Sequence, residues 1–225
     1  MGCAGAVPSR YVPCDVSILV PGHRIRQGEH EAMTLTLIAR NPYTRQIGVA
    51  MASGSDDCAG GSLYIDHDFG VVSVQARGDR AVGARALDLL RAGMNGVEIV
   101  EILSAEDRKI DLRQIIAVPM DGEIGVMTGA QCLHWAGHLR KTHHALAGNM
   151  LGSDKTLQAM EQAYNADMLA PLRRRLFAAL AAGIATGGDV RGHRSGALLV
   201  VGDPAYDLRV TASLQVLHDL SERMA

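Results

Sequence analysis

The stretch Met33-Thr34-Leu35-Thr36-Leu37-Ile38-Ala39-Arg40 decides the fold, because it is the first part of the chain that reads as a core strand. Leu35 and Leu37 alternate with Thr34 and Thr36, as in a strand with two faces. Thr34 follows a methionine, and loss of Met33 would leave Thr34 as a chain terminus. The α-amine of a terminus has an ordinary pKa of about 7.7–8.0. Thr34 would then carry a nucleophilic hydroxyl and its own general base.

Residues 1–32 lack the pattern of a folded segment. They contain three prolines, four glycines and one short apolar run, Val16–Val20, which is too short for the core of a signal peptide. Three interpretations stay open for this N-terminal extension: a start codon assigned upstream of the true start at Met33, a cleaved propeptide, or a retained arm. We expect residues 33–225 to form a single domain.

Composition excludes several classes of protein. The chain has 225 residues, of which 48% are hydrophobic and 20% charged, as expected for one globular domain. A net charge of −2 and an aromatic content of 4% argue against a nucleic-acid partner. No apolar run is long enough to cross a membrane. The four cysteines, at positions 3, 14, 58 and 132, form no CxxC pair, so we expect a cytoplasmic protein without a disulfide framework.

The remaining pattern predicts blocks of strands separated by pairs of helices. Wholly apolar runs at Ile47–Ala52 and Ala197–Val201 are typical of strands that are covered on both faces. Helical spacing recurs at residues 84–103, 157–184 and 216–224. We interpret residues 53–68 as a Gly/Asp-rich loop and residues 129–148 as a long, His-rich connection. This order predicts an α+β fold in which two sheets pack together under helical layers.

Several short segments carry a resemblance to a known family, and the match runs from Met33 to about Val210. They are Ile38-Ala39-Arg40, Gly48–Ser53, Asp111-Leu112-Arg113-Gln114, Thr128–Cys132, Trp135-Ala136-Gly137-His138, Gly148–Leu151 and Gly187–Gly192 with Ser195. With a threonine heading the first strand, the layout resembles the N-terminal-nucleophile (Ntn) hydrolase fold. The chain is similar to a bacterial and archaeal family in that superfamily, domain of unknown function 1028. The resemblance implies a four-layer αββα sandwich and a hydrolase-like site, but supplies no substrate.

A looser resemblance is to proteasome-type β subunits, in which an acidic residue and a Ser-Gly pair lie between a helix and a strand beside the terminal threonine. Asp189, Ser195 and Gly196 occupy such a segment here, with a longer spacing. Those subunits also hold a lysine on an early strand, which this chain lacks. A cation that tunes the Thr34 amine would therefore be a histidine or an arginine, such as His67 or Arg77.

These patterns nominate a set of catalytic residues. Thr34 is the candidate nucleophile, and its alternative is an ordinary strand threonine. Asp189 could orient the site or accept a hydrogen bond from the amine, and Ser53 could contact the amine. Gly148-Asn149 could donate a backbone or side-chain N–H to an oxyanion, with Asn149 as the candidate residue. The alternative for Asp189 is an ordinary residue at the end of a helix, and the alternative for Ser53 and Asn149 is an ordinary turn residue.

Substrate contacts are assigned to a second set. Arg77, Arg191 and Arg194 could clamp a carboxylate, with structural ion pairs as the alternative. The matched segments add Ser195, Trp135 and His138. Four histidines, at positions 134, 138, 143 and 144, form no HExxH pattern and have no cysteine partner, so we expect no metal and no cofactor.

The sequence therefore predicts an amide-cleaving hydrolase that acts on a small, anionic substrate through a Thr34 acyl-enzyme. The alternative is a catalytically inactive Ntn-fold protein that binds a small molecule. In either case we expect a homo-oligomer.

Overall fold

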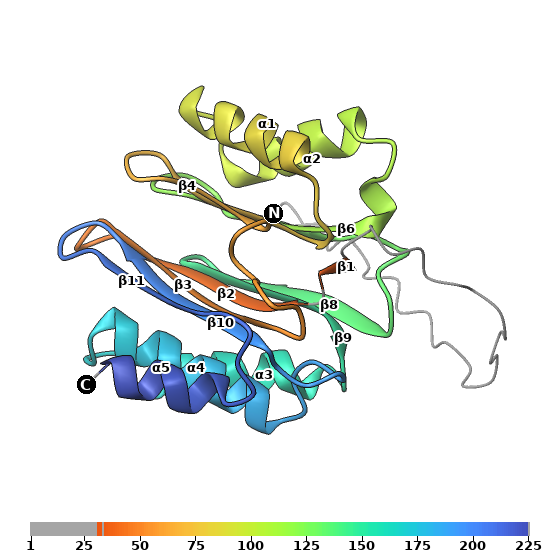
Figure 1. The fold of residues 1–225 in the computed structure, drawn as a ribbon. Coiled ribbons are helices and arrows are strands. Elements are labelled where there is room, and N and C mark those ends of the chain that lie inside the picture. Colours follow the sequence, from red (N-terminus) through yellow and green to blue (C-terminus); the bar gives the residue numbers. More distant parts are fainter. Residues whose placement is uncertain (1–30, 33, 225) are drawn as a thin grey trace, which may run out of the picture.

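The computed structural model describes residues 31–32 and 34–224. They form two antiparallel sheets, one above the other, with helices over both outer faces (Figure 1). The predicted mixture of helices and sheets is confirmed. The proposed N-terminal extension, residues 1–32, lies outside the described residues apart from its last two.

The first sheet is built around β5 (Gly70–Arg77). β6 (Arg113–Pro119) pairs with one edge of β5, and β7 (Gly125–Thr128) pairs with β6. The other edge of β5 is shared by two short strands, β4 (Leu63–Asp66) and β1 (Glu31–Ala32). The backbone just before Thr34 therefore adds to the first sheet, beside Ala76 and Arg77.

The second sheet has the order β11-β10-β3-β2-β9-β8. Its strands are β2 (Thr34–Asn41), β3 (Gln46–Ser53), β8 (Trp135–Arg140), β9 (His144–Leu151), β10 (Ser195–Val201) and β11 (Tyr206–Val210). The apolar runs that predict doubly covered strands lie in β3 and β10, which are buried along almost their whole length.

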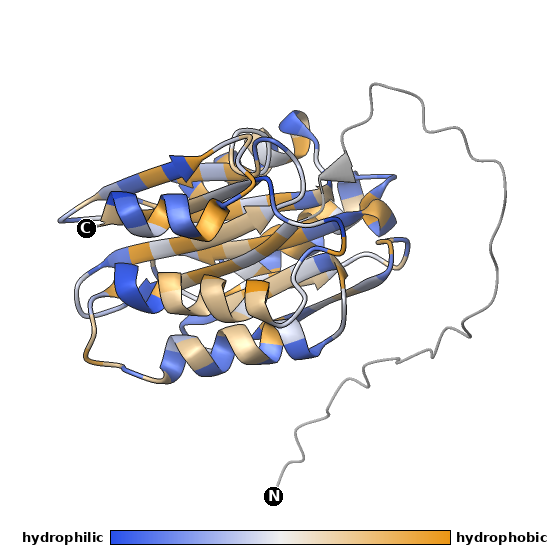
Figure 2. Ribbon diagram, turned by 60° about the horizontal axis from the view of Figure 1, so that its bottom comes forward, coloured by the Kyte–Doolittle hydropathy of each residue, from blue (hydrophilic) through white to orange (hydrophobic). Residues whose placement is uncertain are grey.

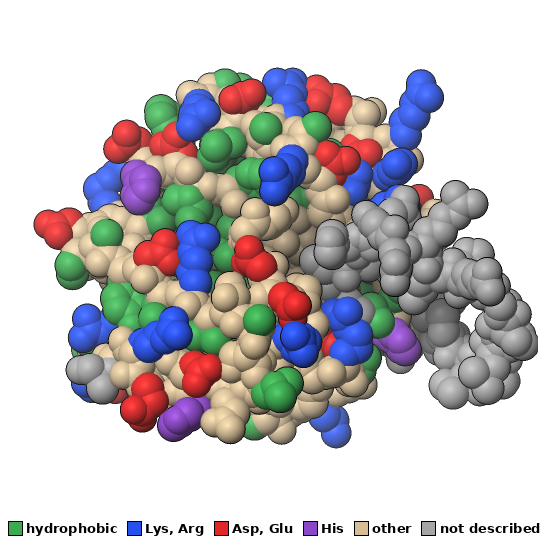
Figure 3. All heavy atoms as spheres, viewed as in Figure 1, with side chains coloured by type: hydrophobic (Ala, Val, Ile, Leu, Met, Phe, Trp, Pro, Cys, Tyr) green, Lys and Arg blue, Asp and Glu red, His purple; other side chains and the backbone are tan. Residues whose placement is uncertain are grey.

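Five α-helices in the described part of the chain cover the outer faces of the two sheets. α1 (Arg80–Arg91) and α2 (Gly96–Glu106) lie over the first sheet, followed by a short 3₁₀ turn at Ile110–Leu112. α3 (Lys155–Asn165), α4 (Leu172–Ala185) and α5 (Val216–Met224) lie over the second. A reciprocal pair of hydrogen bonds between Asn95 and Glu98 caps the start of α2. No helix among these residues is long and apolar enough to span a membrane. Basic and acidic side chains are interspersed over the face of the molecule seen in Figure 3.

Three apolar clusters hold the layers together. One lies between α1–α2 and the first sheet, one between the sheets, and one between the second sheet and α3–α5. Figure 2 shows apolar residues on the strands and polar residues on the outer sides of the helices. Alternation places Ile38, Val49 and Leu199 between the sheets, while Leu35 and Leu37 face the helices.

Two predictions about connections are wrong. Residues 129–148 are not a long connection, because they contain β8 and the start of β9, a central strand of the second sheet. The loop assigned to residues 53–68 contains β4. Strand β9 was missed because Ala145, Ala147 and Gly148 have low strand propensity. Their small side chains are nevertheless suited to a strand that is buried on both faces.

Candidate functional site

Four polar side chains form a row across one end of the second sheet. Strand pairing places Thr34 of β2 beside Ser53 of β3, and Ser53 beside Ser195 of β10. On the other side of β2, Leu35 pairs with Gly148 of β9, so that Asn149 lies next to Thr34. All four residues are buried. They share the face of the sheet that carries Ile38, so the row faces the first sheet.

Thr34 has an unusual environment within this row. Thr34 is fully buried, and among the described residues its Oγ1 atom has no hydrogen-bond partner. A buried hydroxyl without a partner costs free energy, about 1–3 kcal/mol, so such groups in native structures call for an explanation. Here the unpartnered hydroxyl belongs to the residue that the sequence nominates as the nucleophile.

Asp189 reaches the row through the backbone. Its Oδ2 accepts a hydrogen bond of 2.6 Å from the Gly54 N–H, directly after Ser53. The Ser53 hydroxyl lies 2.8 Å from that of Ser55, and the Ser195 hydroxyl donates to the Ser55 carbonyl at 2.8 Å. The corner that ends β3 is therefore fixed by Asp189 and Ser195. Asp189 is therefore positioned to orient Ser53 through the Gly54 backbone.

Two of the predicted substrate arginines hold carboxylates of this protein. Arg191 Nη2 lies 3.2 Å from Asp189 Oδ2, and Arg194 Nε lies 2.5 Å from Asp56 Oδ1. Both side chains are about half-exposed. In this structure they match the alternative interpretation, that of structural ion pairs.

The first sheet faces the row with Gln75 and Gln114. Gln75 and Gln114 are fully buried between the sheets. Gln75 Nε2 donates to Gln114 Oε1 at 2.8 Å, and Asn149 Nδ2 donates to the same oxygen at 3.1 Å. Thr36 Oγ1 donates to Gln75 Oε1 at 2.7 Å. A polar network therefore crosses the gap between the sheets behind Thr34.

Backbone carbonyls decide which terminal atom of each of these side-chain amides is the nitrogen and which is the oxygen. Gln114 Nε2 points at the carbonyls of Gly137 and Gly148, at 3.0 and 2.9 Å. Because a carbonyl can only accept, this atom must be the nitrogen, and Oε1 must be the acceptor. Asn149 therefore turns its NH₂ group toward Gln114. One of its two N–H bonds is already used there, which leaves one for the oxyanion role assigned to Asn149.

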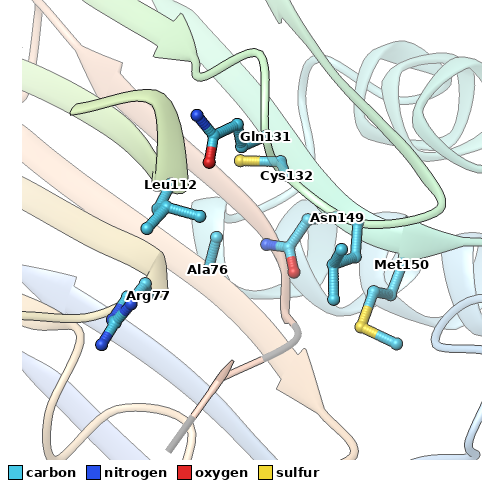
Figure 4. A pocket seen from close by; sticks show the side chains of 8 residues that line it. Ala76, Arg77, Leu112, Gln131, Cys132, Asn149 and Met150 are labelled. Atoms are coloured by element: carbon cyan, nitrogen blue, oxygen red, sulfur yellow. The ribbon is translucent and has the colours of Figure 1, made fainter. Parts of the chain in front are cut away.

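A small pocket adjoins the row. It is lined by Ala76, Arg77, Leu112, Gln131, Cys132, Leu133, Asn149 and Met150, and Figure 4 shows Arg77 and Asn149 on either side of Ala76. Its free space is about 20 Å³, enough for about one water molecule. Burial raises the pKa of the Cys132 thiol to about 11, so this thiol is protonated at neutral pH and is a poor nucleophile.

The two remaining predicted contacts differ in their position. Trp135 packs against the cluster on the helix side of the second sheet, so the structure does not bring it to the row. His138 is connected to the row indirectly, because its Nδ1 lies 2.9 Å from Thr128 Oγ1 and Gln114 Nε2 lies 2.8 Å from that same oxygen. Loss of solvation, followed by the charge of Arg140, lowers the pKa of His138.

The two candidate cations lie at opposite ends of the first sheet. Arg77 ends β5 and lines the pocket beside Asn149. His67 follows β4 and lines a separate cavity with Leu199 and Val201. Of the two, only Arg77 lines the pocket that Asn149 lines. No group of three or more His, Cys, Asp or Glu side chains in the described ranges could hold a metal ion.

Sequence reasoning missed Gln75, Gln114 and Thr128 as parts of the site. Each lies on a strand face that otherwise contributes Val71, Ile116 and similar apolar residues to the core. A glutamine within an apolar strand is the signal that could have found two of them, since buried amides need partners.

The model of a family of unknown function, DUF1028, matches residues 34–220. The chain belongs to this family. A DUF1028 structure, that of protein SPO2555 from Silicibacter pomeroyi, is 30% identical with a TM-score of 0.78, over 85% of this chain and 84% of that one. No curated protein matches the chain. The DUF1028 match begins at Thr34, so the polar row lies within the part that the family shares.

Proposed function

We propose that this DUF1028 protein is an N-terminal-nucleophile hydrolase that cleaves an amide bond in a small, anionic substrate. The observation that carries the proposal is the buried Thr34 hydroxyl at the head of β2, which has no hydrogen-bond partner in the part of the chain that the structure describes. The order of layers, helices over two facing sheets, fits the Ntn sandwich.

The chemistry requires a chain that begins at Thr34. Its hydroxyl would attack the substrate carbonyl while its α-amine takes the proton and returns it to the leaving amine. The new ester would then be cleaved by water. Asn149 has one N–H left to stabilise the oxyanion. Ser53, held by the Asp189 corner, lies beside Thr34 to orient the amine.

Arg77 is the strongest candidate for the substrate's negative charge. It lines the pocket with Asn149, whereas Arg191 and Arg194 are not among the lining residues. With β1 lying along β5, the free space in this pocket is small. Removal of the residues before Thr34 would uncover the backbone of Ala76 and Arg77.

The same pairing of β1 with β5 favours a second candidate function, a binding protein that keeps its N-terminal segment. In that form the Thr34 nitrogen stays in a peptide bond and cannot act as a base. Intact mass of protein made from its native upstream region separates the two candidates. A chain that begins at Thr34 supports the enzyme, and a chain that keeps residues 1–33 supports the binding protein.

The enzyme proposal is tested with protein whose mass confirms a Thr34 terminus. A β-lactone probe should label Thr34, with no labelling of Thr34→Ala and partial labelling of Thr34→Ser. Thr44→Ala, at an exposed turn, is the matched control and should label like wild type. Equal labelling of Thr34→Ala and wild type would assign the nucleophile elsewhere. Failure of every ester, amide and probe to react would leave the binding function.

A further inference from the structure

A third cavity lies at the opposite end of β2 from Thr34. It has a volume of about 530 Å³, within the range of about 300–1,000 Å³ that small-molecule sites occupy. It is lined by Arg40, Gly122, Glu123, Ile124, Arg140, Lys141 and Thr142. Three of these side chains are cationic and one is anionic.

Two guanidinium groups are held in place there by backbone carbonyls. Arg40 donates from Nη1 to the Pro119 carbonyl at 3.0 Å and from Nη2 to the Thr142 carbonyl at 3.2 Å. Arg140 donates from Nη1 to the Ile124 carbonyl at 3.3 Å. Pro119 and Ile124 lie on either side of the turn between β6 and β7. The guanidinium groups of Arg40 and Arg140 are therefore held on either side of the turn between β6 and β7.

Among the described residues, no carboxylate lies within ion-pair distance of the Arg40 or Arg140 guanidinium group. Lys141 differs, since it lies 2.9 Å from Glu161. The nearby Asp121 lies 3.3 Å from Arg45. Burial lowers the pKa of Arg40, which means that its cation loses solvation, and the charge of Asp121 opposes this effect. A bound anion would stabilise both guanidinium groups.

We propose that this cavity binds a small molecule that carries two or more oxyanion groups, either phosphates or carboxylates. A guanidinium has five N–H donors. Arg40 uses two of them in the contacts above, and Arg140 uses one. The remaining donors match the paired oxygens of these groups. The site is separate from Thr34 and does not depend on the proposed hydrolysis.

The test is calorimetric titration of the full chain at low ionic strength with two probes, pyrophosphate and citrate. We expect saturable binding of at least one of them, with about one molecule per chain and weaker binding at high salt. Pyrophosphate alone would identify a phosphate ligand, and citrate alone a carboxylate ligand. Arg140→Gln, at an exposed residue, should weaken binding about tenfold, and Glu123→Gln should tighten it severalfold.

Arg85→Gln is the matched control, because Arg85 is equally a surface arginine but pairs with Glu106 on the helical layer at 2.8 Å. It removes the same charge and should leave the affinity unchanged. Binding that falls equally in Arg140→Gln and Arg85→Gln would reduce the effect to net charge and overturn the proposal. So would the absence of binding of both probes to wild type.

Discussion

The polar network between the sheets gives a stability prediction that rests on Gln114. Its side chain takes part in five hydrogen bonds, from Nε2 to Thr128, Gly137 and Gly148 and to Oε1 from Gln75 and Asn149. Gln114→Leu keeps the approximate volume and removes all five. Among the residues that the structure describes, Asn149 Nδ2 then has no partner, and Gln75 Nε2 keeps two contacts of 3.4 Å to the carbonyls of Thr34 and Ala147.

The magnitude follows from these groups. A buried donor without a partner costs about 1–3 kcal/mol, and one lost donor plus one weakened donor together cost about 3 kcal/mol. For a domain of this size, each kcal/mol lowers Tm by about 2–4 °C, so Gln114→Leu should lower it by about 6–12 °C. The free energy of unfolding is measured by urea unfolding and Tm by thermal unfolding, both followed by circular dichroism. Gln158→Leu, an exposed glutamine on α3, should change the free energy of unfolding by less than about 0.5 kcal/mol.

The double variant Gln75→Leu/Gln114→Leu sharpens the test. Removing both members of a pair leaves fewer donors unpaired than the two single changes combined, so the double loss should be smaller than the sum. A loss below about 1 kcal/mol in Gln114→Leu, or strict additivity in the double variant, would refute the view that this network joins the two sheets.

Three further predictions follow from other parts of the fold. Burial is the main cause that lowers the pKa of His144 and His193; the unfolded chain therefore binds protons first, and the free energy of unfolding should fall as the pH drops below about 6.5. NMR titration should place both pKa values below that of a free histidine, and a stability that is equal at pH 7.5 and 5.5 would contradict this. Gly125→Ala would place its Cβ 1.8 Å from the Gly96 carbonyl oxygen, and thermal unfolding should show a loss of about 3 kcal/mol, whereas Gly61→Ala, with nothing within 4 Å, should be near neutral. Burial raises the pKa of the Cys58 thiol to about 12, so peptide mapping after iodoacetamide treatment at pH 8 should find Cys58 unmodified in native protein and modified in urea; rapid native modification would show that the thiol is accessible.

The sequence predicted the layers better than the connections. Runs that are apolar at every position, such as Ile47–Ala52, mark strands that are buried on both faces, and this signal depends only on local composition. Strand β9 lacks it, because Ala145, Ala147 and Gly148 are small rather than β-branched. Their place in the sheet is decided by partners far away in the chain, which no local pattern reports.

The candidate site was predictable in part for the same reason. Thr34, Ser53 and Ser195 were nominated singly, and strand pairing places them in one row. The ion pairs of Arg191 and Arg194 depend on Asp189 and Asp56. The pairing of Arg194 with Asp56 joins two distant loops, so neither partner could be named in advance. Gln114 was noted as part of a family segment, but its role depends on four other elements that meet around it.

The polar row exists in one strand register only. If β2 slipped by one residue against β3, Leu35 and Leu37 would turn toward the first sheet, and Thr34 and Thr36 would turn toward α4. The threonine hydroxyls would then enter the apolar layer, and the row would lose the member that faces Ser53. A misregistered chain thus loses its core and its site in the same step. For this fold, a chain that carries the row has assembled its strands in the correct register. A cellular process that removes misfolded chains would therefore also remove chains that lack the site.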